Sequence, residues 1–154
     1  MVLRVGLISD THGLLRPEAI EFLRGSDFIV HAGDICALET LSQLGVLAPV
    51  TAVRGNNDRG PWAENLRSAE FLRAGAITIY VVHDLADLDI DLSSAGVRVV
   101  VSGHSHKPHI EERHGVLVVN PGSAGPRRFR LPIAAAELFI EGESVTARIT
   151  ELVN

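Results

Sequence analysis

Aspartate and histidine side chains recur in this chain at a short, regular spacing. Asp10 and His12 lie two residues apart, and so do His104 and His106. On a continuing extended backbone this spacing would aim both side chains of a pair to the same side. Imidazole nitrogens and carboxylate oxygens together suit divalent transition metals. A single pair is more often a turn or a helix cap, so the metal hypothesis depends on what the remaining chain supplies.

Further polar residues follow apolar runs in the same way. The runs 2–9, 28–30, 50–53, 76–82 and 97–101 are short and rich in β-branched residues, which is typical of buried strands. Open α/β sheets bind ligands in the crevice beyond the carboxyl ends of their strands. We therefore expect one group of side chains to meet there. The candidates are Asp10, His12, Asp34, Asn56, Asn57, Asp58, His83, Asp84, His104 and His106.

The segments between these runs predict the elements that position the group. Residues 17–24 and 37–44 have the apolar spacing of short helices, and Gly25 ends the first. Strand–helix–strand order favours parallel strands and right-handed crossovers. Beyond Pro61 the pattern changes to hairpins, at 70–82, 110–119 and 134–152. Residues 85–95 are expected to be helical or irregular, with Asp87, Asp89 and Asp91 on a solvated face.

Composition limits the classes of protein that remain. A length of 154 residues predicts a single domain spanning residues 1–154. The net charge of −5 argues against a general binder of nucleic acid or of anionic membranes. Cys36 is the only cysteine, which excludes an internal disulfide and a cysteine-based zinc site. No apolar stretch of about 20 residues occurs, so we expect a soluble cytoplasmic protein.

In their order along the chain, the polar motifs resemble the signature of the calcineurin-like metallophosphoesterase superfamily. The motifs are Asp10-x-His12, Gly33-Asp34, Gly55-Asn56-x-Asp58, His83 and Gly103-His104-x-His106. The small size and the segment Asn120-Pro121-Gly122-Ser123 are similar to the small single-domain phosphodiesterase branch. The resemblance covers residues 10–123. It implies an α/β metallo-dependent phosphatase-like fold, a four-layer αββα sandwich of two mixed β-sheets with the metal loops along one edge.

The resemblance also implies a ligand set and a reaction. Asp34 would bridge two divalent transition metal ions, with Mn²⁺ expected first and Ni²⁺, Fe, Zn²⁺ or Co²⁺ as alternatives. One ion would take Asp10, His12 and His106, and the other Asn56, His83 and His104. The expected reaction is hydrolysis of small phosphodiesters by a metal-bridging hydroxide. Asp34 and Asn56 would serve it directly, and Asp58 is expected to fix the loop.

Two departures from the family pattern keep an alternative open. Asn57 stands where many relatives carry a histidine thought to protonate the leaving group, and Asp84 follows His83 where the branch usually has glycine. The alternative is a metal-bound interaction scaffold on the same fold, as the retromer subunit that resembles this branch is. A nuclease is less favoured, because the basic cluster contains only Arg127, Arg128 and Arg130.

Other polar residues and the assembly state are left open by the sequence. Arg127 and Arg128 would contact a substrate phosphate or lie in a solvated loop. His31 is expected to be structural or to orient Asp34, and His109 and His114 to be structural or exposed. A homo-oligomer is not excluded.

Overall fold

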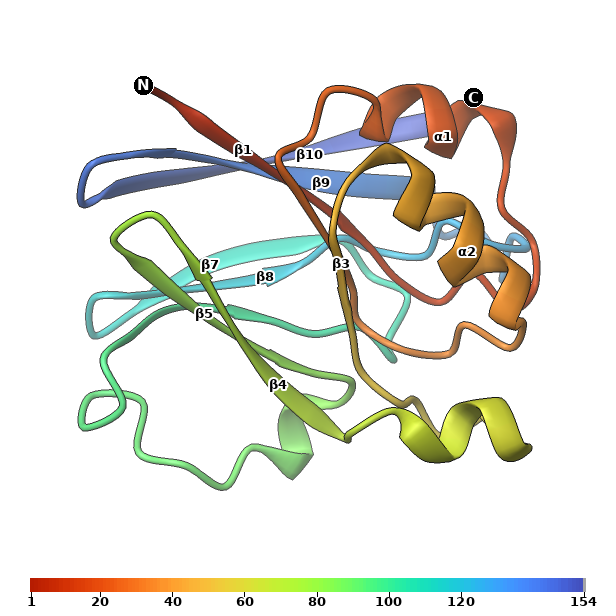
Figure 1. Ribbon diagram of the computed structural model, residues 1–154, viewed down its shortest axis with the longest axis horizontal. Coiled ribbons are helices and arrows are strands. Elements are labelled where there is room, and N and C mark those ends of the chain that lie inside the picture. The colour runs from red at the N-terminus through yellow and green to blue at the C-terminus, as the bar shows by residue number, and fades with distance from the viewer. Residues whose placement is uncertain (154) are drawn as a thin grey trace.

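Two five-stranded mixed β-sheets pack face to face in the computed structural model, which describes residues 1–153 (Figure 1). The first sheet has the strand order β10-β9-β1-β2-β3. Its strands are β1 (Leu3–Ile8), β2 (Phe28–His31), β3 (Val50–Ala52), β9 (Ile133–Glu141) and β10 (Ser144–Val153). β1, β2 and β3 run parallel, and the C-terminal hairpin β9–β10 adds to them in antiparallel pairing.

The second sheet is built mainly from hairpins, as the sequence predicts beyond Pro61. Its strand order is β4-β5-β6-β8-β7. The strands are β4 (Ala69–Ala74), β5 (Ile77–Val82), β6 (Val97–Val101), β7 (His109–Arg113) and β8 (Val116–Asn120). β5, β6 and β8 are parallel, whereas β4 and β7 are antiparallel edge strands. Both sheets are therefore mixed, which confirms the predicted fold class.

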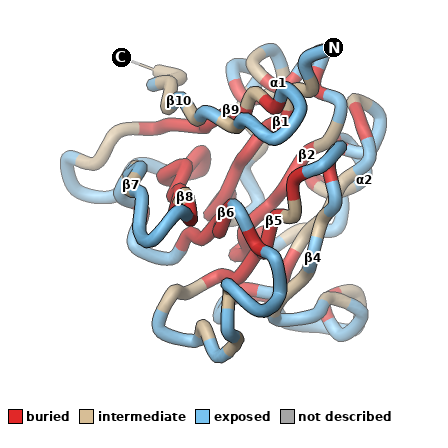
Figure 2. The backbone as a smooth tube through the Cα atoms, turned by 90° about the vertical axis from the view of Figure 1, so that its left-hand side faces the viewer, coloured by how far each residue is buried: buried red, intermediate tan, exposed pale blue. Residues whose placement is uncertain are grey.

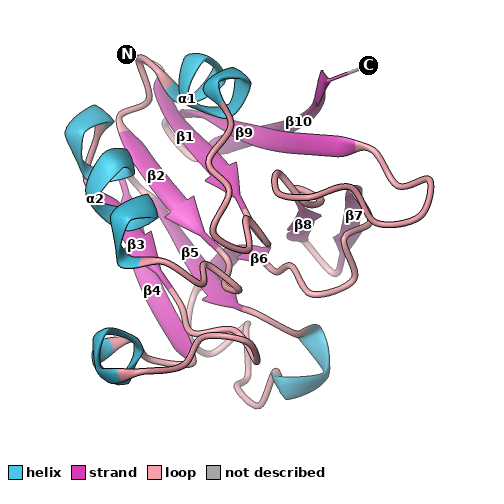
Figure 3. Ribbon diagram, turned by 90° about the vertical axis from the view of Figure 1, so that its right-hand side faces the viewer, coloured by secondary structure: helices cyan, strands magenta, loops and turns pink. Residues whose placement is uncertain are grey.

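Two α-helices cover the outer face of the first sheet (Figure 3). They are α1 (Pro17–Leu23) and α2 (Leu38–Leu47). Pro17 suits the first position of α1, because that position has no intrahelical partner for an N–H group. Leu23 of α1 and Leu44 of α2 are buried in one cluster with Ile8 and Ile29 of the sheet. β1 is thus buried on both faces, as its continuous apolar run predicts.

The outer face of the second sheet is covered differently. A short 3₁₀ turn, η2 (Leu85–Asp87), and an irregular segment up to Val97 lie over it, without an α-helix. The carboxylate of Asp91 accepts hydrogen bonds from the backbone N–H groups of Ser93 and Ser94, which favours a turn over a helix. Leu88 and Leu92 pack on the sheet from this segment. The fourth layer of the sandwich is therefore mostly loop. A further 3₁₀ helix, η1 (Pro61–Asn65), was not anticipated.

The main core lies between the two sheets, where the inner strands are buried (Figure 2). Val5 and Leu7 of β1 meet Ile79 and Val81 of β5 in this cluster. Hydrogen bonds join loops at the carboxyl ends of strands from both sheets: the His104 N–H donates to Asp10 Oδ2, and His83 Nδ1 donates to the Ala32 carbonyl. The two sheets therefore present their polar loops along one shared edge. No helix within residues 1–153 has the length and apolar character needed to cross a membrane.

Candidate metal centre

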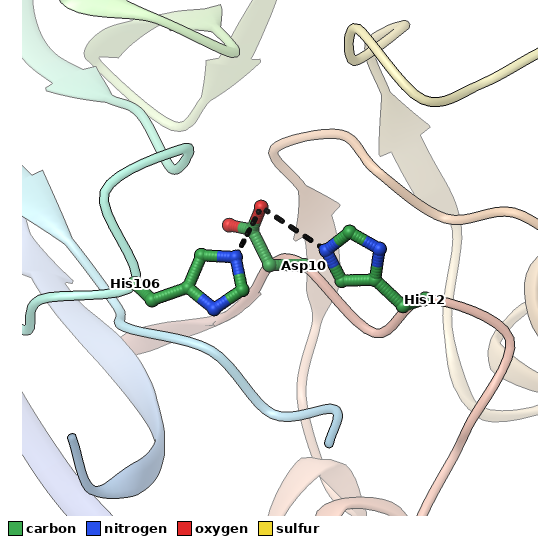
Figure 4. Close-up of side chains that lie close together, drawn as sticks. All are labelled: Asp10, His12 and His106. Atoms are coloured by element: carbon green, nitrogen blue, oxygen red, sulfur yellow. Dashed lines mark ion pairs between the residues drawn. The ribbon is translucent and has the colours of Figure 1, made fainter. Parts of the chain in front are cut away.

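Asp10, His12 and His106 converge at this edge (Figure 4). Oδ1 of Asp10 lies 3.4 Å from Nε2 of His106 and 3.9 Å from Nε2 of His12. Ligand atoms around one tetrahedral metal ion are spaced about 3.4 Å apart, so these separations suit a shared ion. Asp10 Oδ1 and His12 Nε2 are buried and have no hydrogen-bond partner among residues 1–153. Buried polar atoms without partners are rare, and a cation would satisfy both.

A second group of side chains lies directly beside the first. Nε2 of His83 is 3.0 Å from Oδ1 of Asn56 and 3.4 Å from Oδ2 of Asp34. Nδ1 of His104 lies 3.3 Å from the same Asn56 oxygen. Asp34 Oδ2 is also 3.7 Å from Nε2 of His12, so Asp34 stands between the two groups. The structure thus brings together all seven residues that the sequence predicts as ligands.

The charges around His83 and Asp34 suit cation binding. Nδ1 of His83 donates a hydrogen bond to the Ala32 carbonyl at 2.7 Å, so Nε2 is the ring nitrogen that faces Asp34 and Asn56. Burial opposes ionisation of Asp34, but hydrogen bonds from His83 and Asn57 hold its pKa well below the usual range. Burial lowers the pKa of His83, but Asp34 and the Ala32 carbonyl outweigh it and raise that pKa to about 9, so a metal ion at Nε2 would replace a proton. Asp34 is therefore a carboxylate at neutral pH.

The backbone at the ligands differs from the expected extended form. β1 ends at Ile8, and Asp10 and His12 have φ angles of 55° and 47°, in the left-handed region. His104 and His106 repeat this conformation, with φ angles of 71° and 65°. The expectation of a continuing extended backbone is therefore wrong. The loop curls because the N–H groups of Asp10, His12 and Gly13 bond to the carbonyls of Gly33, Asp34 and Ile35.

Asp58 holds the loops that carry Asp34 and Asn56. Its side chain is buried, and its Oδ1 accepts hydrogen bonds from the N–H groups of Ile35 and Cys36. Its Oδ2 accepts from the N–H groups of Asp34 and Gly55. Four backbone donors therefore occupy the carboxylate. This geometry favours a positioning role for Asp58, in line with the expectation that it fixes the loop.

His31 holds the loop of Asp10 and His12. Its Nδ1 accepts a hydrogen bond from the Gly33 N–H, so its Nε2 carries the proton and donates to Oγ1 of Thr11 at 2.9 Å. Complete burial lowers the pKa of His31 to about 4, so the ring is neutral. His31 therefore contacts Thr11, the residue between the two ligands, and reaches the neighbours of Asp34 through Gly33 and, by way of Thr11, the Ile35 carbonyl. His109 and His114 are exposed.

Several supporting contacts were not predicted from the sequence. Oγ of Ser9 donates to Oδ2 of Asp10, and the His104 N–H donates to the same oxygen. Asn120 donates from Nδ2 to the Gly103 carbonyl, and Ser123 from Oγ to the Asp10 carbonyl. The segment 120–123 therefore braces both ligand loops. The resemblance had singled out this segment, but nothing in the sequence indicated which residues it contacts.

The close approach of the loops explains two glycines. A Cβ atom on Gly55 would collide with Asp34, and one on Gly103 would collide with Ser9 and Asp10. Cys36 lies near the site, with Sγ 3.8 Å from Nδ1 of His12. Burial raises the pKa of the Cys36 thiol to about 11, so it is protonated at neutral pH and is a poor metal ligand.

Within residues 1–153, the side-chain hydrogen bond of the basic loop 127–130 does not involve the proposed metal ligands. Arg127 donates from Nη1 to the carbonyl of Leu131, which closes its own loop. Arg128 and Phe129 line a separate hollow with Ser105 and Lys107. The structure therefore gives Arg127 a loop-stabilising contact, and whether Arg128 meets a substrate phosphate stays a prediction.

The fold and this cluster define a two-sheet α/β protein with Asp and His groups able to bind metal. Residues 3–143 match the calcineurin-like phosphoesterase superfamily domain. The chain therefore belongs to the calcineurin-like phosphoesterase superfamily, a family that depends on divalent metals, and the family prediction is confirmed.

Similar proteins agree with this assignment. The chain is 37% identical to a probable metallophosphoesterase of Methanothermobacter thermautotrophicus, over 94% of this chain and 90% of that protein. It is 27% identical to a phosphodiesterase of Methanocaldococcus jannaschii, over 78% and 83% of the two chains.

Solved structures share the fold. Vacuolar protein sorting 29 from Cryptosporidium parvum superposes with a TM-score of 0.84 and 21% identity, over 99% of this chain and 93% of that one. An archaeal phosphodiesterase superposes with a TM-score of 0.78 and 24% identity, over 96% of this chain and 100% of that one. One fold thus occurs both in a protein named for sorting and in one named for catalysis.

Proposed function

We propose that this protein is a metal-dependent phosphodiesterase with two divalent ions at the shared loop edge. The observation that carries the proposal is the pair of buried atoms without partners, Asp10 Oδ1 and His12 Nε2, directed at one point. A cation there satisfies both atoms. Asn56, His83 and His104 lie together beside them and supply the nitrogen and oxygen ligands for a second ion. The family membership and the phosphodiesterase among the relatives support this reaction class.

Each residue has a defined part in the proposal. Asp34 joins the two groups, because its Oδ2 faces both His12 and His83. Asp10, His12 and His106 hold one ion, and Asn56, His83 and His104 the other. When bound, the ions supply Lewis-acid polarisation of the phosphate and an activated solvent nucleophile. Asp58 and His31 keep the loops in register through backbone and Thr11 contacts.

The charge of the site favours a phosphate ester. Two divalent ions carry four positive charges, and Asp10 and Asp34 return two negative charges. The loop edge is then positive although the chain has a net charge of −5, so it attracts phosphate. The mixed nitrogen and oxygen ligand set suits Mn²⁺, and Ni²⁺, Fe, Zn²⁺ and Co²⁺ are the alternatives.

The test combines metal analysis with hydrolysis of aryl phosphodiesters and phosphomonoesters after loading with Mn²⁺ or Ni²⁺. We expect turnover of diesters by the wild type. In Asp34→Asn we expect metal content to fall and kcat to drop about a thousandfold, since a charged ligand shared by both groups is lost. Asp27→Asn is the matched control. Asp27 is exposed, and its carboxylate accepts a hydrogen bond from the Arg4 N–H rather than contacting a proposed ligand. Absence of turnover with every metal, at full metal content, would contradict the proposal.

The scaffold alternative gives a different result in the same experiment. The likeness to vacuolar protein sorting 29 shows the fold alone, because the identity is 21%. A scaffold would bind its partner equally well before and after Asp34→Asn. The oligomeric state stays a prediction, and size measurement of the purified protein would determine it.

A further inference from the structure

A hollow of about 300 Å³ opens beside the second ligand group. Three of the proposed ligands, Asn56, His83 and His104, lie in its wall. A substituent of a phosphodiester whose phosphate lies at these ligands would therefore extend into this space. The wall also contains Arg54, Ser68, Tyr80, Asp84, Asp87 and Asp89.

Tyr80 is a polar residue in this wall without an internal partner. It lies in the middle of β5 and is 4% exposed. Its ring packs against Phe71, with ring centroids 4.9 Å apart. The side-chain hydrogen bonds within residues 1–153 do not include its hydroxyl, and burial, together with the negative charge of Asp89, raises its pKa. An aromatic ring with a free hydroxyl therefore lines a hollow that joins the ligand cluster.

Two of the three carboxylates in the wall of the hollow form no ion pair within residues 1–153. Asp84 is the only one of the three with internal contacts: Oδ1 accepts from the Ala86 N–H, and Oδ2 lies 3.5 Å from Nε2 of His104. Asp87 and Asp89 are exposed and form no ion pair with residues 1–153. Arg54 is the one basic residue in the wall, and its Nε donates to the carbonyl of Asp58. The formal charge of the wall is therefore −2, from three carboxylates and one guanidinium, with His83 and His104 counted as neutral because the proposal makes them ligands of a bound ion.

Opposite charges thus lie next to each other. With two ions bound, the loop edge is positive and attracts phosphate, whereas the adjoining hollow is negative. A ligand that carries a phosphate and a nearby cation complements both. An aromatic side chain among carboxylates is also a recognised environment for alkylammonium groups.

We propose that this hollow binds a positively charged alkylammonium substituent of the phosphodiester, so that the preferred substrates are zwitterionic. The proposal rests on the phosphodiesterase function above and names its substrate class. A substituent with a second phosphate would be repelled by Asp87 and Asp89. A neutral substituent would enter without the electrostatic gain.

The test uses two esters that differ by one charge. They are the p-nitrophenyl phosphodiester of choline and that of 3,3-dimethylbutanol, in which carbon replaces the quaternary nitrogen. We expect kcat/KM to be about threefold to tenfold higher for the choline ester, since each exposed charge pair contributes about 0.2–1 kcal/mol. The double variant Asp87→Asn/Asp89→Asn should bring the ratio close to one. Equal kcat/KM for both esters in the wild type would overturn the proposal.

Asp91→Asn is the matched control for the charge change. Asp91 lies on the same segment but outside the hollow, and asparagine keeps an oxygen for the Ser93 and Ser94 bonds. The wild-type ratio should persist in this variant. A ratio that fell as far as in the double variant would assign the preference to the general field of the protein and contradict a local site.

A binding measurement separates this inference from the catalytic one. Phosphocholine and 3,3-dimethylbutyl phosphate are titrated calorimetrically into the Mn²⁺-loaded protein. Tighter binding of phosphocholine, by about threefold to tenfold, supports the hollow even if neither ester is turned over, which would contradict only the phosphodiesterase function. Equal affinities overturn the inference whatever the turnover.

Discussion

The two ends of the sheets use the same backbone conformation for different purposes. At the end away from the ligands, the β4–β5 and β9–β10 hairpins turn at Gly75 and Gly142, both with φ of 59°. At the ligand end, Asp10, His12 and Asp34 have φ angles of 55°, 47° and 57°. Glycine adopts this region without strain, whereas a residue with a Cβ atom pays about 1 kcal/mol or more. The ligand end therefore contains strain that the opposite end avoids.

The difference shows what the ligand loops require. Glycine would relieve the strain but could not offer an imidazole or a carboxylate. The strained conformation persists because a lattice of hydrogen bonds holds it, with Asp58 accepting four backbone N–H groups. The strain at the ligand end thus arises because aspartate and histidine side chains occupy backbone positions that glycine would adopt without strain.

Removal of the Asp58 carboxylate should have the largest effect on stability. Asp58→Ala leaves three buried N–H groups and one part-buried N–H group without their acceptor, so we expect the free energy of unfolding to fall by about 3 kcal/mol. Urea denaturation in EDTA measures it. Asp27→Ala is the control, because Asp27 accepts one exposed backbone bond, from Arg4, and should cost about 1 kcal/mol or less. Equal losses in the two variants would show that the lattice does not hold the ligand loops.

Asn57→His tests whether the ligand end tolerates a new chemical group. Asn57 donates to Asp34 from its backbone N–H and from Nδ2, and the substitution keeps the first bond and removes the second. Histidine could protonate a leaving group, so we expect about a tenfold gain in kcat for esters with poor leaving groups and little change for aryl esters. Metal content should stay at the wild-type level. A series of esters of rising leaving-group pKa measures this, and an unchanged dependence would show that position 57 does not reach the leaving group.

The smallest effects are expected when glycine replaces a strained residue at the ligand end, or when a residue with a Cβ atom replaces glycine at the opposite end. His12→Gly should raise the free energy of unfolding in EDTA by about 0.5 kcal/mol, because the strain is relieved, and should abolish binding of one ion. Gly142→Ala places a Cβ atom at a positive φ and should cost about 1 kcal/mol without changing metal content. Thermal or urea denaturation and metal analysis check both. A large loss of stability in His12→Gly would refute the idea of strain at the ligands.

Local patterns predicted most of the strands, and the resemblance to a known family implied the ligand set. The β-branched runs ending before Asp10, Asp34 and Asn56 indicated buried parallel strands, and polar residues after strand ends indicated a site. The layer over the second sheet was not predicted in detail. The segment 85–95 carries apolar residues at spacings that suit either a helix or a loop. In the structure, the Asp91 carboxylate accepts hydrogen bonds from the N–H groups of Ser93 and Ser94, which favours a loop.

The sequence by itself determined which residues could bind a metal, because residue type and position after a strand are local properties. It did not determine how they meet. The left-handed backbone of Asp10 and His12, the four bonds to Asp58 and the bracing by Asn120 all depend on loops distant in sequence that lie at one edge. The acidic hollow beside His104 likewise exists only when β3, β5 and the segment after residue 83 are packed together. Only the tertiary structure sets these contacts, since they join separate parts of the chain.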